Sequence, residues 1–116
     1  MIELSTVESQ NMSKNWTEKQ LEAFYTKEVK ALPYEVVDIK IMRANVRGVP
    51  DRLAVGTFPG GFCFIEFKSP KGTGRLSLHQ ISFHKLLRAV GAEVYVVASK
   101  DDVLALPMFN TFIKDC

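Results

Sequence analysis

The chain has 116 residues, of which 47% are hydrophobic and 24% charged, and a net charge of +2. This length fits one globular domain with a core and excludes a second domain. The sequence has no run of about 18 apolar residues, which argues against a membrane helix, and its amino terminus lacks the pattern of a secretory signal. We therefore expect a cytoplasmic protein with no membrane contact.

The cysteine count and the net charge are both weak indicators. Cys63 and Cys116 are too few for a disulfide framework, so we expect a buried free thiol in the core and a second one at the chain end. A charge of +2 permits nucleic-acid binding but does not by itself indicate it.

The first predicted element is a helix over residues 18–31. Residues 1–15 are polar and lack periodicity, so we expect a loose amino-terminal arm there. Thr17 is a good N-cap residue, Gln20 completes a capping box, and Pro33 ends the helix. An apolar stripe at helical spacing predicts the face that packs on the core: Leu21, Phe24, Tyr25, Val29 and Leu32.

Three strands are predicted next. Residues 35–42 are rich in Val and Ile, and residues 53–55 and 62–67 flank the turn sequence Pro59-Gly60-Gly61. The last two runs should therefore pair as a hairpin, with the chain folding back on itself between them.

Charged residues at the open end of this hairpin are candidates for a site. Glu66 and Lys68 are two apart and so share one face of a strand, and the hairpin brings Asp51 toward Glu66. Two converging carboxylates repel each other, and a divalent cation between them would offset that cost. A cross-strand salt bridge, with Asp51 capping the turn, explains the same spacing.

Basic residues flank this part of the chain. Arginine binds phosphate through paired hydrogen bonds, and mobile basic loops position DNA without reading its sequence. A solvated loop is the simpler explanation for any one of these side chains. The candidate nucleic-acid contacts are Arg43, Arg47, Arg52, Lys71 and Arg75.

A second helix is predicted over residues 78–90, with Ser77 as its cap and Gly91 as its end. His79 and His84 lie roughly 140° apart on such a helix, so they do not form a zinc pair and neither is assigned as a ligand. We expect a broad apolar face on this helix: Ile81, Phe83, Leu86, Leu87 and Val90.

The carboxyl-terminal part begins with a strand over residues 93–98. Together with the helix before it, this strand completes a βαβ crossover, which should be right-handed and place the strand parallel to residues 62–67. A last helical piece begins at Ser99 and is broken by Pro107, and residues 108–113 should form a short second segment.

Two motifs carry a family resemblance. Gly48-Val49-Pro50-Asp51-Arg52, followed by Ile65-Glu66-Phe67-Lys68, resembles the PD-(D/E)xK nuclease core and specifically the VRR-NUC domain, the virus-type replication-repair nuclease. The similarity runs from about residue 17 to about residue 99 and includes Gln80 and the first helix. It implies an α/β, restriction-endonuclease-like fold with a mixed β-sheet flanked by helices, and one such domain over residues 1–116.

The resemblance also implies a metal-dependent DNA endonuclease. In such an enzyme Mg²⁺ or Mn²⁺ would be held by Asp51, Glu66, the backbone carbonyl of Phe67 and a glutamate of the first helix. Glu18 matches that glutamate best, while Glu22 and Glu28 stay as alternatives. Lys68 would orient the attacking hydroxide or stabilise the pentacovalent phosphate. Gln80 would contact the lysine or the scissile region.

Small VRR-NUC proteins occur in viruses, including phage, and in bacteria, and the family is associated with homodimers and with branched DNA such as Holliday junctions. A viral protein would act in the host cell cytoplasm. Met108, Phe109 and Phe112 are candidates for a dimer surface if they are exposed. Two other functions stay open: a non-catalytic nucleic-acid-binding module with the same fold, and a structural domain whose carboxylates are only salt-bridged.

Overall fold

Four strands form one mixed sheet in the order β1-β2-β3-β4. A computed structural model describes residues 16–42, 45–69 and 75–110 of the chain, so the expected amino-terminal arm lies outside the described residues. The first three strands pair antiparallel, and β4 is parallel to β3, as predicted. The strands are β1 (Val36–Lys40), β2 (Arg52–Gly56), β3 (Phe62–Phe67) and β4 (Val94–Val97).

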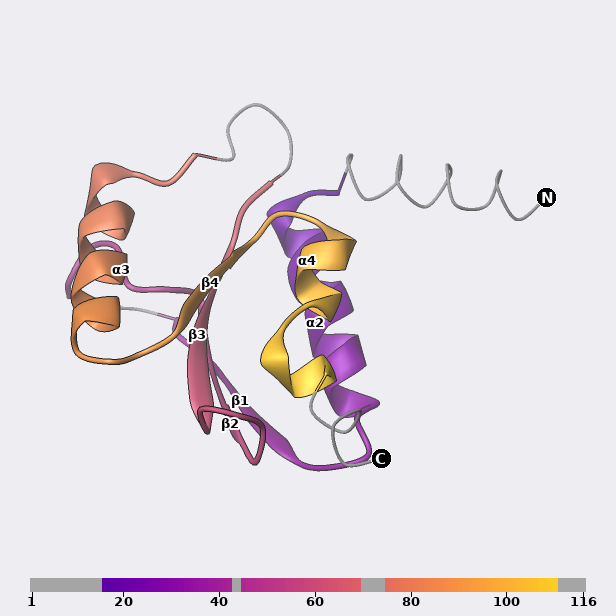
Figure 1. The fold of residues 1–116 in the computed structure, drawn as a ribbon. Helices are drawn as coiled ribbons and strands as arrows, with labels where there is room; N and C mark the ends of the chain where they lie inside the picture. Colours follow the sequence, from indigo (N-terminus) through magenta and orange to yellow (C-terminus); the bar gives the residue numbers. More distant parts are fainter. Residues whose placement is uncertain (1–15, 43–44, 70–74, 111–116) are drawn as a thin grey trace.

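The helices lie on both faces of this sheet, which gives the α/β architecture that the sequence predicted. Figure 1 shows α3 on one side and α2 with α4 on the other. The helices are α2 (Glu18–Lys30), α3 (Leu78–Ala89), α4 (Lys100–Leu104) and a short 3₁₀ turn, η1 (Pro107–Phe109). Both long helices begin with a capping box, Thr17 with Gln20 and Ser77 with Gln80.

The core lies between the sheet and the layer of α2 and α4. Leu21, Tyr25 and Val29 of α2 are buried there, which confirms the predicted stripe, while Phe24 and Leu32 pack at its margin. The other buried members of this core are Ala54, Phe58, Cys63, Ile65, Phe67, Val97, Val103, Leu106 and Met108. Burial raises the pKa of the Cys63 thiol to about 12, so it is an unreactive core residue.

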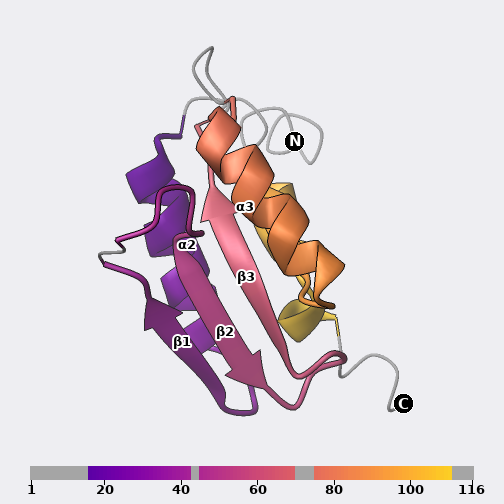
Figure 2. The same ribbon diagram turned by 90° about the vertical axis from the view of Figure 1, so that its left-hand side faces the viewer.

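The helix α3 forms as predicted, but the prediction of its buried apolar face was wrong. Its expected apolar face is largely exposed, since Val90 has 74%, Leu86 59% and Ile81 38% of its surface accessible. The one buried residue of this helix is His84. The helix lies along the β3–β4 side of the sheet, as Figure 2 shows, and leaves β1 and β2 uncovered. Because α3 covers only part of the sheet, few of its side chains contact the sheet. The helix therefore has no broad buried face.

The uncovered sheet face carries two rows of apolar residues. The strand register places Val37, Val55 and Phe62 side by side, and Ile39, Leu53 and Phe64 in the next row. Val37, Ile39, Val55 and Phe62 are all exposed. We call these six residues the open apolar face.

Met108 cannot contribute to a dimer surface in the way that the sequence suggested. It is fully buried, and Phe109 is half-buried against the core. Phe112 lies outside the described residues. The Tyr34 hydroxyl donates a hydrogen bond to the backbone carbonyl of Met108, which ties this segment to the end of α2.

Candidate functional site

The β2–β3 hairpin brings Asp51 and Glu66 together. Arg52 pairs with Ile65, so Asp51 lies opposite Glu66 one step further along the antiparallel ladder. Asp51 is held there by its backbone N–H, which donates to the carbonyl of Ile65 at 3.1 Å. Its carboxylate accepts a hydrogen bond from the backbone N–H of Phe67 at 2.8 Å. The antiparallel register thus fixes the convergence that the hairpin predicted.

Glu66 is buried between the sheet and α3, with 3% of its surface exposed. Its Oε2 accepts a hydrogen bond from Nε2 of Gln80 at 3.1 Å. Its Oε1 has no hydrogen-bond partner among the described residues and lies 3.4 Å from Nε2 of His84. The resemblance implied a contact of Gln80 with Lys68 or the scissile region, whereas the structure gives Gln80 a hydrogen bond to Glu66.

The ionisation of Glu66 reflects this crowding. Burial raises the pKa of Glu66 to about 8, and the charges of Asp51 and Glu18 raise it as well. The ammonium of Lys68 acts in the opposite direction. Asp51, Lys68 and Glu18 are therefore all within electrostatic range of this carboxylate.

The loop that precedes Asp51 is packed against the start of α3. Gly48 has a φ of +93°, and a Cβ added there would lie 2.2 Å from the carbonyl oxygen of His79. Only glycine adopts this backbone conformation readily and leaves room for the helix. The glycine of the Gly-Val-Pro-Asp sequence is therefore needed for the close approach of α3. This approach places Gln80 beside Glu66.

The three candidate glutamates of α2 have different surroundings. Glu18, in the first turn of the helix, acts electrostatically on Glu66. Glu22 instead forms an ion pair with Arg52 at 3.4 Å. For Glu28, farther along the helix, the described residues give no contact with the site. Of the three, Glu18 is the one whose charge acts on Glu66.

Arg52 is not presented to a nucleic acid. It is 7% exposed, lies over the ring of Tyr25 at 5.6 Å, and forms ion pairs with Asp38 and Glu22 on the α2 face of the sheet. Successive residues of a strand point to opposite faces, so Arg52 points away from the side that Glu66 occupies. The structure thus gives it a structural role in place of the predicted contact.

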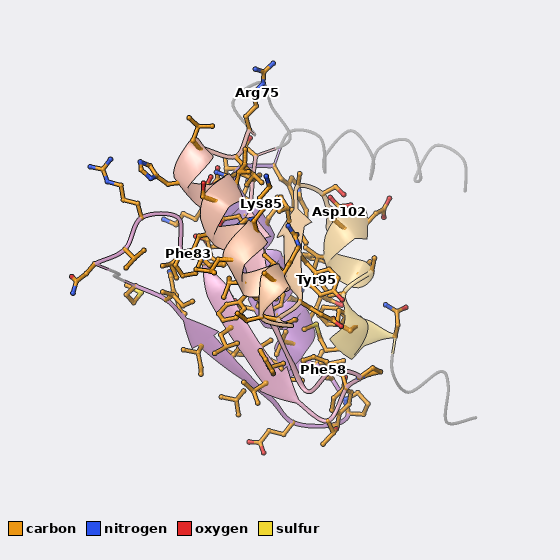
Figure 3. The ribbon with its side chains drawn as sticks, turned by 60° about the vertical axis from the view of Figure 1, so that its left-hand side comes forward. Phe58, Arg75, Phe83, Lys85, Tyr95 and Asp102 are labelled. Atoms are coloured by element: carbon orange, nitrogen blue, oxygen red, sulfur yellow. The ribbon has the colours of Figure 1, made fainter. Side chains whose placement is uncertain are left out.

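The other basic candidates are Arg43, Arg47, Lys71 and Arg75. Arg47 and Arg75 are exposed, and Arg43 and Lys71 are outside the described residues. Figure 3 shows Arg75 projecting from the end of the molecule opposite Phe58. The sequence analysis missed a groove of about 510 Å³ along α2 that has lysines on its rim: Lys19, Lys27, Lys30 and Lys40.

His84 is also absent from the sequence-based site. Burial lowers the pKa of His84, and the positive charges of Arg88 and Lys68 lower it further. The available signal was its position four residues after Gln80, which puts both side chains on one face of the helix. Glutamine and histidine are both common on helices, so this spacing alone does not indicate a site. It indicates one only because the structure places Gln80 against Glu66.

The donor set suits a hard divalent cation. The described residues contain no group of three or more His, Cys, Asp or Glu side chains arranged to hold a metal ion. They do bring two carboxylates together, one with a buried oxygen that lacks a partner. Carboxylate and backbone carbonyl oxygens with water completing the shell are the ligands that Mg²⁺ takes in proteins. The residues present therefore fit such an ion.

The fold, together with a similar solved structure, supports a nuclease-type α/β domain. No family model matches the sequence, and no curated protein matches it. A solved structure described as "VRR_NUC domain" is similar, with 27% sequence identity and a TM-score of 0.61 over 76% of this chain and 91% of that one. The chain is thus similar to the VRR-NUC domain in fold and in sequence, which confirms the resemblance seen in the motifs. No helix among the described residues is long and apolar enough to cross a membrane.

Proposed function

We propose that the chain is a metal-dependent DNA endonuclease that uses Mg²⁺ or Mn²⁺. The observation that carries this proposal is the convergence of Asp51 with Glu66, whose buried Oε1 has no partner among the described residues. Asp51, Glu66 and the carbonyl of Phe67 would hold the ion, with Glu18 contributing from α2. The similarity to a VRR-NUC domain supports the same reaction class.

Each residue of the site has a chemical task in this proposal. The bound ion would supply a water of lowered pKa and neutralise charge that builds up on the phosphate. Gln80 holds Oε2 of Glu66 and so fixes the orientation of the carboxylate. Lys68 follows on the same strand face as Glu66, where its ammonium would orient the attacking water or stabilise the pentacovalent phosphate.

The substrate that we propose is branched DNA such as a Holliday junction. Arg47 and Arg75 are exposed and could contact phosphates, and we retain Arg43 and Lys71 as candidates. The groove along α2, on the opposite face of the sheet from Glu66, is lined by Lys19, Lys27, Lys30 and Lys40, which could also contact phosphates. Phosphate contacts of this kind would position the DNA independently of its sequence.

We propose a homodimer as the active form, because a four-way junction needs two symmetric cuts and each chain has one site. The open apolar face is the surface that a second copy would cover. Its six residues form two contiguous rows, and contiguous exposed apolar patches mark interaction surfaces.

One observation favours a second candidate function. Within the described part of the chain, no three His, Cys, Asp or Glu side chains form a metal-binding group. A module that binds nucleic acid without cleaving it would fit that arrangement. The convergence of Asp51 with the buried Glu66 argues for the nuclease, since carboxylates without a compensating cation destabilise a fold.

A cleavage assay separates these functions. Wild-type protein and Asp51→Asn are incubated with linear, flap and four-way DNA, with Mg²⁺ or Mn²⁺ and with a chelator. We expect metal-dependent cleavage by the wild type and at least about a 100-fold lower rate for Asp51→Asn, because the variant loses a charged ligand and its electrostatic stabilisation of the reaction.

Asp101→Asn is the matched control, because Asp101 is an exposed aspartate on α4. Its rate should equal that of the wild type. Equal rates for Asp51→Asn and the wild type would refute the site. DNA binding without cleavage under either metal would favour the binding module.

A further inference from the structure

The most deeply buried position of α3 is occupied by a histidine. His84 is 1% exposed, although apolar side chains of the same helix, Ile81 and Leu86 among them, are turned to solvent. A buried polar group without a partner is unfavourable, and an apolar residue at this position would avoid that cost. The choice of histidine therefore points to a function at this position.

The imidazole faces a specific atom. Its Nε2 lies 3.4 Å from Oε1 of Glu66, and neither of these atoms has a hydrogen-bond partner in the described residues. A neutral imidazole has one N–H donor, and a carboxylate oxygen has two lone pairs to accept it. Hydrogen bonds at such sites are often long before the ligand is bound and shorten afterwards.

Gln80 completes the arrangement. It lies one turn before His84 on α3 and donates to Oε2 of Glu66 at 3.1 Å. The two side chains of one helix face thus approach the two different oxygens of one carboxylate. Each oxygen keeps a lone pair, so the carboxylate remains able to bind a cation.

We propose that His84 is a positioning residue that donates its Nε2–H to Oε1 of Glu66 and, with Gln80, fixes this carboxylate for a divalent cation. The inference rests on the proposed metal-dependent function and adds a residue that the nuclease motif does not contain. It also gives α3 a second role, because the helix orients a ligand that belongs to the sheet. Hydrogen bonds that orient metal ligands contribute substantially to metal affinity.

The test measures Mn²⁺ binding in the absence of DNA, by the electron paramagnetic resonance signal of free Mn²⁺. His84→Leu removes the donor and should raise the Kd for Mn²⁺ about 10- to 100-fold. His84→Gln retains an N–H donor and should recover much of the affinity, which a purely packing role would not predict. His79→Leu is the control, because His79 is exposed on the same helix and should leave the Kd unchanged.

A crystal structure of the metal-free wild type provides an independent readout. We expect a hydrogen bond between Nε2 of His84 and Oε1 of Glu66, and in His84→Leu a changed Glu66 side-chain conformation. A wild-type structure without this contact would overturn the inference whether or not the variant folds. So would a folded His84→Leu with unchanged Mn²⁺ affinity. A wild type that has the contact but binds no Mn²⁺ would refute the metal site, and with it the role of His84 in cation binding.

Discussion

At the scale of single residues, Glu66 combines burial with a close carboxylate neighbour. Burial and the neighbouring negative charge both disfavour the ionised form of Glu66. A bound cation would offset both effects. A group whose pKa is displaced this far, at the end of a strand beside a lysine, is typical of functional sites. The metal-free protein therefore bears a cost whenever Glu66 is ionised.

This cost predicts a pH dependence of the free energy of unfolding. The pKa of Glu66 is raised from 4.5 to about 8 on folding, so the folded state binds more protons than the unfolded state between these values. The stabilising contribution is complete below about pH 4.5 and is lost as the pH rises through about 8. Each pKa unit corresponds to about 1.4 kcal/mol, so the loss amounts to a few kcal/mol.

Urea unfolding between pH 4 and 9, with and without Mg²⁺, measures this effect. Glu66→Gln is the comparison, because it removes the titrating group and nearly keeps the size of the side chain. The stability of the wild type relative to Glu66→Gln should fall as the pH rises, and Mg²⁺ should restore it near pH 8. A difference that does not change with pH would contradict the environment described for Glu66.

At the scale of elements, α3 is positioned in part by contacts of its amino-terminal turn. Gly48 touches the backbone of His79 and Gln80, and the Gln80 side chain reaches Glu66. The loop before β2, the end of β3 and the start of α3 are thus joined at one point. The position of this helix and the geometry of the site depend on each other.

Gly48→Ala tests this dependence. The added Cβ would lie 2.2 Å from the carbonyl oxygen of His79, and the φ of +93° is unfavourable for alanine. We expect a loss of stability of about 2 kcal/mol or more, because backbone strain and a clash act together. We also expect weaker Mn²⁺ binding, because Gln80 would move away from Glu66. Thermal unfolding and the Mn²⁺ titration measure both effects.

Gly61→Ala is the matched control for Gly48→Ala. Gly61 also has a positive φ, of +78°, but a Cβ there would meet nothing within 4 Å. The Gly61→Ala variant should show the effect of backbone strain without a clash. We expect a smaller loss of stability than for Gly48→Ala and unchanged metal binding. If the two variants behave alike, the close approach of α3 to Gly48 has no role of its own.

At the scale of the whole molecule, the helices cover the sheet unevenly. One face is covered by α2 and α4, whereas α3 covers only the β3–β4 side of the other and exposes the open apolar face (Figure 2). Exposed contiguous apolar surface promotes association. The symmetric cleavage that we propose requires two copies of the chain. We therefore expect a second copy to cover this surface.

Val55→Lys tests the proposed dimer surface. Val55 lies in the middle of one row, between Val37 and Phe62, and is 39% exposed. A lysine there would be solvated in the monomer but would need desolvation in the dimer, so the dimer should dissociate with little change in the thermal midpoint. Sedimentation velocity over a range of concentrations measures the monomer fraction.

Leu104→Lys is the control for that experiment. Leu104 is 38% exposed but lies on α4, on the opposite side of the sheet. It should leave the association unchanged. A wild type that stays monomeric at high concentration, or a Val55→Lys variant that associates normally, would count against this surface.

The sequence by itself determined the elements and the hairpin. Capping residues, turn glycines and the period of the apolar residues act over a few positions, so the bounds of α2, β2 and β3 could be predicted. The antiparallel pairing follows from the turn, and with it the approach of Asp51 to Glu66. The family resemblance was also readable from the motifs.

Tertiary packing decided which side chains are buried and with what partners. The apolar residues of α3 fit a core helix by pattern, yet the sheet buries His84 in their place. The sequence suggested that Arg52, next to Asp51, contacts nucleic acid. Side chains alternate between the two faces of a strand, however, and Arg52 is turned toward Asp38 and Glu22. These outcomes depend on which face of each element meets which neighbour, and such contacts join residues far apart in the chain. Local patterns fix the elements, whereas the ligand environment of Glu66 exists only once the sheet and α3 have come together.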